Sequence, residues 1–141
     1  MLELECPPEL RAAALAALET CGIGDGHLTV ALVDEMRIRE LNRLHRNLDR
    51  PTDVLSFPVD GTEPVAGPRE LGDVVICPEH TVDREEAVVH GILHLAGMDH
   101  ETDAGEMLAL QDRVVRGLRF KRAPQARSRG LQVGRSPSIP K

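Results

Sequence analysis

Aromatic residues are scarce in this sequence, which has no tryptophan, no tyrosine and only two phenylalanines. Proteins that bind single-stranded nucleic acid commonly stack its bases on exposed aromatic side chains. Because that signature is missing, we expect any contact with RNA to rest on arginine side chains and on the backbone.

Signals for membranes and secretion are also missing. No apolar run approaches the roughly 18–20 residues of a transmembrane helix, and the opening stretch MLELECPPEL lacks the basic and apolar regions of a secretory signal. The three cysteines are widely spaced and form no Cys-x-x-Cys pair, which favours reduced thiols over a disulfide framework. We therefore expect a cytoplasmic protein without a membrane partner.

The charge is unevenly distributed along the 141 residues, a length typical of one domain. Residues 120–141 hold six of the 17 basic residues and none of the 23 acidic ones. This segment is rich in Pro, Ser, Gly and Arg without apolar periodicity, so we predict a single domain at 1–119 and a basic, disordered tail at 120–141. The tail is either an electrostatic arm for RNA or ribosomes, or an extension without a role.

Apolar periodicity predicts the order β-α-β-α-β-β-α-α. Short β-type runs at 2–5, 27–33, 53–59 and 71–77 alternate with helical patterns, two of which follow the capping pairs Asp83/Glu86 and Asp103/Glu106. We predict an α+β fold, a single small domain with a mixed four-stranded sheet packed by helices. In the second helix, capped by Asp34, the predicted inward stripe is Ile38, Leu41, Leu44 and Leu48.

Half of the chain's six histidines lie in the segment HGILHLAGMDH at 90–100. His90 and His94 are four residues apart, which places both imidazoles on one face of a helix. Gly97 is a natural place for the helix to end, and the turn can bring His100 round to the first two. Three imidazoles suit zinc and leave a fourth position for water, as in catalytic zinc sites. Packing alone is a weaker explanation, because a core gains more from leucine.

The same spacing occurs in metzincin proteases, H-E-x-x-H-x-x-G-x-x-H, where the glutamate is the general base. Position 91 of this chain is glycine. The pattern therefore predicts a zincin-like metal helix and metal-activated water, and it argues against ordinary zinc proteolysis.

Three ordered blocks resemble the YbeY family, the bacterial metal-dependent endoribonucleases of ribosomal-RNA maturation. The segment at 90–100 is similar to that family's HGxLHLxGYDH, PTDVLSFP at 51–58 to its PT[DN]VLSFP, and LGDVVIC at 71–77 to its LGD[IL]VI. The resemblance runs from about Leu41 to Leu118. It implies a small α+β domain with a mixed sheet.

The resemblance implies that His90, His94 and His100 bind one Zn²⁺ per chain. It also implicates Arg46, because Leu41, Asn42 and Arg46 match the family's L-N-x-x-Y-R block, with His45 in place of the tyrosine. The implied function is single-strand-specific endoribonuclease activity in ribosomal-RNA maturation at the small-subunit 3′ end and in ribosome quality control. A zinc-activated water or hydroxide would attack the phosphodiester while Arg46 binds the phosphate, and ribosomal particles or ribosome-associated proteins are the expected partners.

The chain departs from that pattern at Met98, which replaces a tyrosine, at Gln111, where a glutamate is frequent, and in a shorter segment between Cys77 and His90. Asp99 either orients a histidine or caps the end of the helix. Two other classes stay open from the residues. One is a zinc hydrolase of a peptide or small molecule, and the other is a ribosome-assembly factor whose metal is structural.

Overall fold

The computed structural model describes residues 1–60, 66–67 and 69–128, and over these the chain forms four strands, four α-helices and two short 3-10 helices. In chain order they are β1 (Leu2–Glu5), η1 (Pro8–Leu10), α1 (Arg11–Thr20), β2 (Gly26–Leu32), α2 (Glu35–Arg46), β3 (Val54–Pro58), β4 (Glu70–Ile76), η2 (Pro78–His80), α3 (Arg84–Leu95) and α4 (Glu106–Ser128). The predicted order of strands and helices is confirmed, and each predicted strand lies within one residue of the observed one.

The sheet is mixed and has the strand order β1-β2-β4-β3. The β1–β2 and β2–β4 pairs are parallel, and β3 pairs antiparallel with β4. The antiparallel pair is the one formed by consecutive strands, whereas each parallel pair has helices in its connection, as parallel strands require. The α+β fold with a mixed four-stranded sheet is thereby confirmed.

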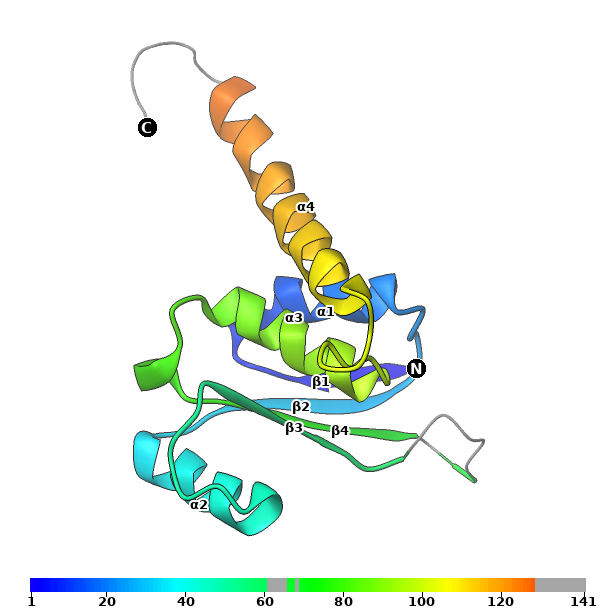
Figure 1. The fold of residues 1–141 in the computed structure, drawn as a ribbon. Helices are drawn as coiled ribbons and strands as arrows, with labels where there is room; N and C mark the ends of the chain where they lie inside the picture. Colours follow the sequence, from blue (N-terminus) through cyan, green and yellow to red (C-terminus); the bar gives the residue numbers. More distant parts are fainter. Residues whose placement is uncertain (61–65, 68, 129–141) are drawn as a thin grey trace.

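Helices cover both faces of the sheet, but unequally. Helices α1, α3 and α4 lie over one face, and α2 lies alone over the other (Figure 1). The larger apolar cluster accordingly joins α1, α3 and α4 to the sheet. The smaller one lies under α2 and comprises Ile38, Leu55, Val75 and Cys77. Among the described residues, no helix has the length and apolar character needed to cross a bilayer.

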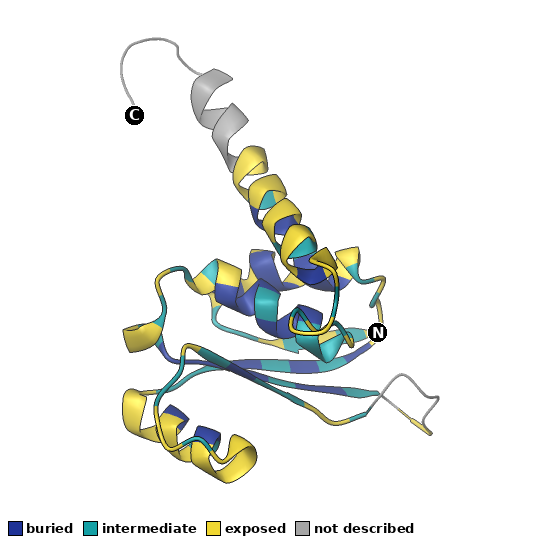
Figure 2. Cartoon of the chain, viewed as in Figure 1, coloured by how far each residue is buried: buried dark blue, intermediate teal, exposed yellow. Residues whose placement is uncertain are grey.

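The stripe predicted on α2 is partly wrong. Ile38 is fully buried and Leu41 packs against the smaller cluster, but Leu44 is 58% exposed. Asn42 is buried in its place, and its side-chain amide donates a hydrogen bond to the Arg50 carbonyl at 2.9 Å. Because α2 covers a small cluster, its buried face is narrow, and most of its surface is exposed (Figure 2).

Helix α4 continues past the predicted domain boundary at 119 and ends at Ser128. Extending an existing helix costs little, and Lys, Arg, Ala and Gln, which are frequent here, are strong helix formers, whereas Pro124 opposes the helix. Residues 129–141 of the predicted tail lie outside the described residues, and the domain boundary at 119 stays a prediction.

Gly91 lets α3 approach the sheet closely. A Cβ atom at this buried position would lie 2.6 Å from Val74 Cγ1 and 3.1 Å from Ser56 Oγ. Ser56 also donates a hydrogen bond to the Gly91 carbonyl at 2.9 Å. The spacing between α3 and the β3–β4 pair therefore depends on the missing side chain.

We expect Gly91→Ala to lower the free energy of unfolding by about 1–3 kcal/mol, because a methyl group overpacks the contact with Val74. Urea denaturation measures the change. The matched control is Gly117→Ala on α4, where a Cβ meets nothing within 4 Å and where alanine should stabilise the helix by up to about 1 kcal/mol. Equal effects of the two substitutions would contradict the close approach of α3.

His27 lies between two carboxylates on the sheet. Its Nδ1 is 2.9 Å from Glu70 Oε1 and its Nε2 is 2.7 Å from Glu5 Oε2. Both partners accept hydrogen bonds, so the imidazole satisfies both when it is protonated. These hydrogen bonds raise the pKa of His27 from 6.5 to about 8, and the bond to Glu5 has a larger effect than the bond to Glu70.

A raised pKa in the folded state stabilises the protein while the group is protonated. The contribution of His27 is fully present below pH 6.5 and is lost as the pH rises through about 8. We therefore expect the free energy of unfolding to decrease between pH 6.5 and 8.5, and the decrease to be smaller in His27→Gln. Urea denaturation at several pH values tests this. Parallel pH profiles in the two proteins would show that His27 is not responsible.

Candidate metal centre

Helix α3 positions the first two histidines, and its start is fixed by a side-chain cap. Asp83 accepts a hydrogen bond from the Glu86 backbone N–H at 3.1 Å and forms an ion pair with Arg119 of α4. The predicted cap by Asp83 is confirmed. Its ion pair holds α3 against α4, so His90 and His94 stand on a helix that is anchored at its start.

The end of α3 brings the third histidine back toward the first two. Gly97 has a φ of +98°, a left-handed conformation that favours glycine. The Gly97 N–H donates to the His94 carbonyl at 3.0 Å, and the Met98 N–H donates to the Leu93 carbonyl at 3.1 Å. This pair of bonds is the Schellman arrangement of a helix end. The predicted role of Gly97 as the helix stop is confirmed.

The three histidines converge as the spacing predicts. Their ring centroids are 4.7 Å apart for His90 and His94, 5.0 Å for His90 and His100, and 5.4 Å for His94 and His100. One nitrogen from each ring lies within 4.8 Å of the others, and all three side chains are partly buried. The cluster can hold a metal ion with three nitrogen ligands.

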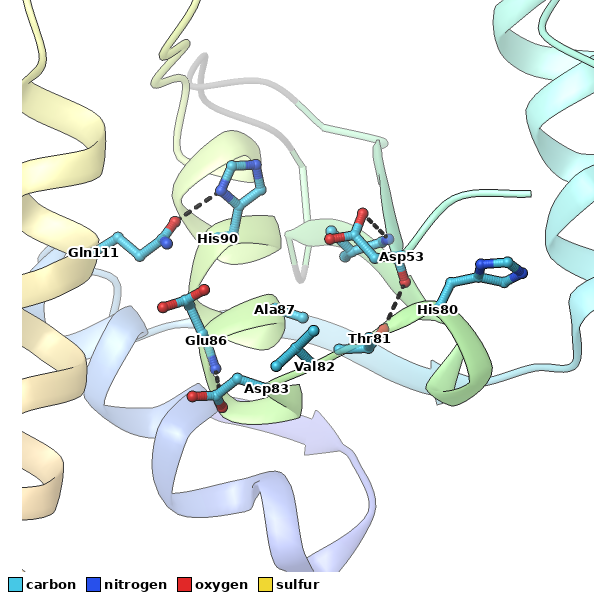
Figure 3. A pocket seen from close by; sticks show the side chains of 10 residues that line it. Asp53, His80, Thr81, Val82, Asp83, Glu86, Ala87, His90 and Gln111 are labelled. Carbon is cyan, nitrogen blue, oxygen red and sulfur yellow. Dashed lines mark hydrogen bonds between the residues drawn. The ribbon is translucent and has the colours of Figure 1, made fainter. Parts of the chain in front are cut away.

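In two of the three histidines, the ring nitrogen Nδ1 forms a hydrogen bond. The Nδ1 of His94 lies 3.0 Å from the Met98 carbonyl oxygen, and the Nδ1 of His90 lies 2.7 Å from Gln111 Oε1 (Figure 3). Both partners accept, so each Nδ1 carries the proton and each Nε2 keeps a free lone pair. This is how metal-binding histidines are usually oriented.

Gln111 is a residue of this site that the sequence motifs do not predict. Gln111 lies on the same face of α4 as the buried residues Met107, Val114 and Val115. A polar residue on an inward helical stripe is the signal that points to it. Its contact explains why a side chain with an acceptor oxygen stands there.

Two further observations test whether the cluster fits a metal. Among the described residues, the buried Nδ1 of His100 has no hydrogen-bond partner. Buried polar atoms are normally hydrogen-bonded, so this nitrogen is an exception. Burial lowers the pKa of His94, and the neighbouring His90 lowers it further. A lowered pKa keeps the imidazole neutral, the form that binds metals. The donor set therefore fits a divalent metal.

The structure also explains why position 91 does not carry the protease glutamate. Gly91 is on the side of α3 that faces the sheet, in contact distance of Val74 and Ser56. A longer side chain has no room there.

Arg46 and His94 line the same hollow, which we call the Arg46 cleft. It has a volume of about 470 Å³ and is formed by the end of α2, by β3 and by the turn after α3. Arg46 is the exposed last residue of α2, which ends at Asn47 in the left-handed conformation. The fold therefore brings together an arginine and a histidine that are 48 positions apart in the sequence.

Asp99 and Glu101 also line the Arg46 cleft. The Asp99 carboxylate accepts a hydrogen bond from the Glu101 N–H at 3.0 Å, and the Asp99 carbonyl accepts from the N–H groups of Thr102 and Asp103. These contacts close the turn that carries His100. They involve neither a histidine nor the end of α3, so the two roles predicted for Asp99 stay predictions.

A second hollow, of about 230 Å³, is lined by His90. Gln111, Asp53 and Glu86 are among its lining residues (Figure 3). Over the described part of the chain, this hollow is lined by carboxylates and by no arginine or lysine, whereas the Arg46 cleft combines its two carboxylates with Arg46. A negatively charged substrate is therefore favoured in the Arg46 cleft.

Comparisons with known proteins show the family to which this chain is similar. Residues 9–119 match the family model described as Endoribonuclease YbeY. The chain is 50% identical over 97 residues to the Endoribonuclease YbeY of Rubrobacter xylanophilus, covering 67% of this chain and 69% of that protein. It is 38% identical over 125 residues to the one from Persephonella marina, covering 77% and 82%.

A solved structure has the same fold. The solution structure of TM1509 from Thermotoga maritima superposes with a TM-score of 0.53 at 34% sequence identity, covering 89% of this chain and 93% of that one. The matched family model spans most of the described residues, including α2, β3 and the three histidines. This chain therefore belongs to the YbeY family of endoribonucleases.

Proposed function

We propose that this protein is a single-strand-specific, metal-dependent endoribonuclease of the cytoplasm that acts on ribosomal RNA, in maturation of the small-subunit 3′ end and in ribosome quality control. The observation that carries the proposal is the Arg46 cleft, because it joins a residue of the histidine cluster to an exposed arginine. Membership of the YbeY family supports the reaction class.

One zinc ion per chain is the metal that we propose for His90, His94 and His100. Among the described residues, the cluster has three imidazoles and no fourth protein ligand, which would leave a position for water. Zinc held by these residues would supply a nucleophile at neutral pH, because it would lower the pKa of a bound water to about 7.

Arg46 binds the phosphate of the substrate in this proposal. Its planar guanidinium can donate two parallel hydrogen bonds to phosphate oxygens and stabilise the charge that develops on them. The carboxylates of Asp99 and Glu101 line the same cleft, so a phosphate is favoured near Arg46 and disfavoured next to the turn. This contrast positions the substrate.

The shape of the cleft supports a preference for single strands. The cleft crosses β3, which is an edge strand of the sheet, and reaches from α2 on one face to the end of α3 on the other. A flexible single strand can follow such a path with its bases splayed out, whereas the bases of a duplex are paired and stacked. The expected partners are therefore single-stranded ribosomal RNA and the ribosomal particles that carry it.

The test is cleavage of a 3′-end fragment of small-subunit ribosomal RNA. The zinc-loaded protein is compared on this strand, on the same strand paired with its complement, and on a mixture of unstructured peptides. We expect the single-stranded RNA to be cut, the duplex to be cut much more slowly and the peptides to remain intact. Chelation should abolish cleavage, and added zinc should restore it.

Other outcomes favour the alternatives. Cleavage of the peptides without cleavage of RNA indicates a zinc hydrolase of another substrate class. Binding to ribosomal particles without cleavage, together with loss of folding on chelation, indicates an assembly factor with a structural metal. Circular dichroism before and after chelation distinguishes a catalytic from a structural metal.

A further inference from the structure

One of the chain's two phenylalanines, Phe57, lies in the Arg46 cleft and contacts an exposed histidine there. The rings of His45 and Phe57 have centroids 4.8 Å apart and planes inclined by 57°. We propose that these two rings form a stacking platform for the base of a nucleotide next to the scissile phosphate. The inference rests on the proposed endoribonuclease function and adds a base-binding subsite to it.

The platform is supported from behind. Phe57 packs against the smaller apolar cluster, whose buried members are Ile38, Leu55, Val75 and Cys77. The backbone of Phe57 is held by the antiparallel β3–β4 pairing, opposite Asp73. The orientation of the phenyl ring is therefore fixed by α2 and the sheet together, while part of its surface stays accessible.

His45 presents the accessible face of the pair. It is exposed and lies one position before Arg46 at the end of α2. Because the two ring planes are inclined by 57°, a base would stack on the exposed imidazole face, with the phenyl ring supporting the imidazole from the side. Histidine and phenylalanine both stack on bases in RNA-binding proteins.

The position of His45 and Phe57 in the Arg46 cleft indicates that their ligand is a nucleotide. Arg46 attracts the phosphate, His94 marks the metal cluster, and His45 and Phe57 line the same hollow as both. A nucleotide carries a charged phosphate close to a flat base. The phosphate matches Arg46, and the base matches the two rings of the cleft. Any base has a π-face, so such a platform is tolerant of sequence, but it needs an unpaired base.

The shortage of aromatic residues predicted RNA contacts by arginine and backbone alone. The fold places Phe57 beside a histidine at the cleft, so one stacking site forms without tryptophan or tyrosine.

The test separates base stacking from phosphate binding. Binding of the zinc-loaded protein is measured for two labelled oligonucleotides, an adenosine pentamer and an abasic ribose-phosphate pentamer of the same charge, with gel electrophoresis to confirm that both stay intact. We expect the wild type to prefer the adenosine pentamer. We expect His45→Ala to weaken binding of that pentamer about 5- to 100-fold, the range for loss of one stacked base, and to leave the abasic pentamer unchanged.

Two further variants serve as controls. His45→Phe restores a flat ring and should keep the preference for the adenosine pentamer. Arg43→Ala removes an exposed arginine about one turn earlier on α2 and should leave the ratio between the two pentamers as it is in the wild type. Thermal unfolding shows whether each variant is folded.

The platform is overturned if the wild type binds both pentamers equally, or if His45→Ala weakens both to the same extent. Cleavage of the ribosomal-RNA fragment, measured on the same preparations, separates this failure from failure of the proposed function. A protein that cuts the fragment but binds the adenosine and abasic pentamers equally is a nuclease without the platform. A protein that shows the His45-dependent preference but does not cut has the platform and is not a nuclease.

Discussion

Replacing Arg46 with alanine is expected to lower the rate of RNA cleavage by about 100- to 1,000-fold, the range for loss of one donor to a developing oxyanion. Bound zinc should stay at the wild-type level, because Arg46 is not part of the histidine cluster. The fold should also be retained, since Arg46 is exposed at the end of α2. Single-turnover cleavage of the ribosomal-RNA fragment, with metal analysis of each preparation, measures both quantities.

Two control variants make the result specific to Arg46. Arg46→Lys keeps the charge but loses the planar fork, so we expect it to recover only part of the activity. Arg43→Ala removes a positive charge from the same helix outside the Arg46 cleft, and we expect at most a small loss that increases at low salt. Equal cleavage by wild type and Arg46→Ala would show that the activity is a contaminant or that another residue binds the phosphate.

Replacing His94 with alanine is expected to remove tight metal binding and, with it, cleavage. Loss of a residue that only orients a ligand commonly costs 10- to 100-fold in metal affinity, so loss of one of three ligands should weaken zinc binding by more than about 100-fold. His94 is partly buried at the end of α3, so the fold should survive. Competition with a zinc chelator of known affinity measures the change.

The matched control for His94→Ala is His27→Gln, which removes a histidine from β2 and leaves the cluster intact. It should bind one zinc per chain with wild-type affinity. Retention of stoichiometric, tightly bound zinc by His94→Ala would refute the ligand assignment. If His94→Ala loses zinc but keeps its RNA cleavage, the histidine cluster is a structural site, and the nucleophile has another origin.

Some features of this protein follow from short stretches of sequence because local physics decides them. Alternation and capping residues located the four strands and the starts of α2 and α3, since a strand or a cap depends on residues a few positions apart. The convergence of His90, His94 and His100 is also decided by residues close together in the sequence. One helix and one turn at Gly97 set their geometry.

Features that depend on packing between distant segments were predicted less well. The exposure of Leu44 and the burial of Asn42 follow from how little of the sheet α2 covers. The spacing within α4 marks Gln111 as a polar residue on the inward face, but its contact with His90 is set only by the packing of α4 beside α3. The continuation of α4 to Ser128 depends on a helix that was already formed.

By itself, the sequence determined the order of the secondary structure, the metal-binding histidines as a candidate cluster and, by resemblance, the family. The tertiary structure alone decided what surrounds that cluster. It placed Arg46 in one cleft with His94 and set His45 against Phe57. The reason is physical, because α2 and α3 pack on opposite faces of the sheet (Figure 1), and only the edge strand β3 brings their ends to a common surface.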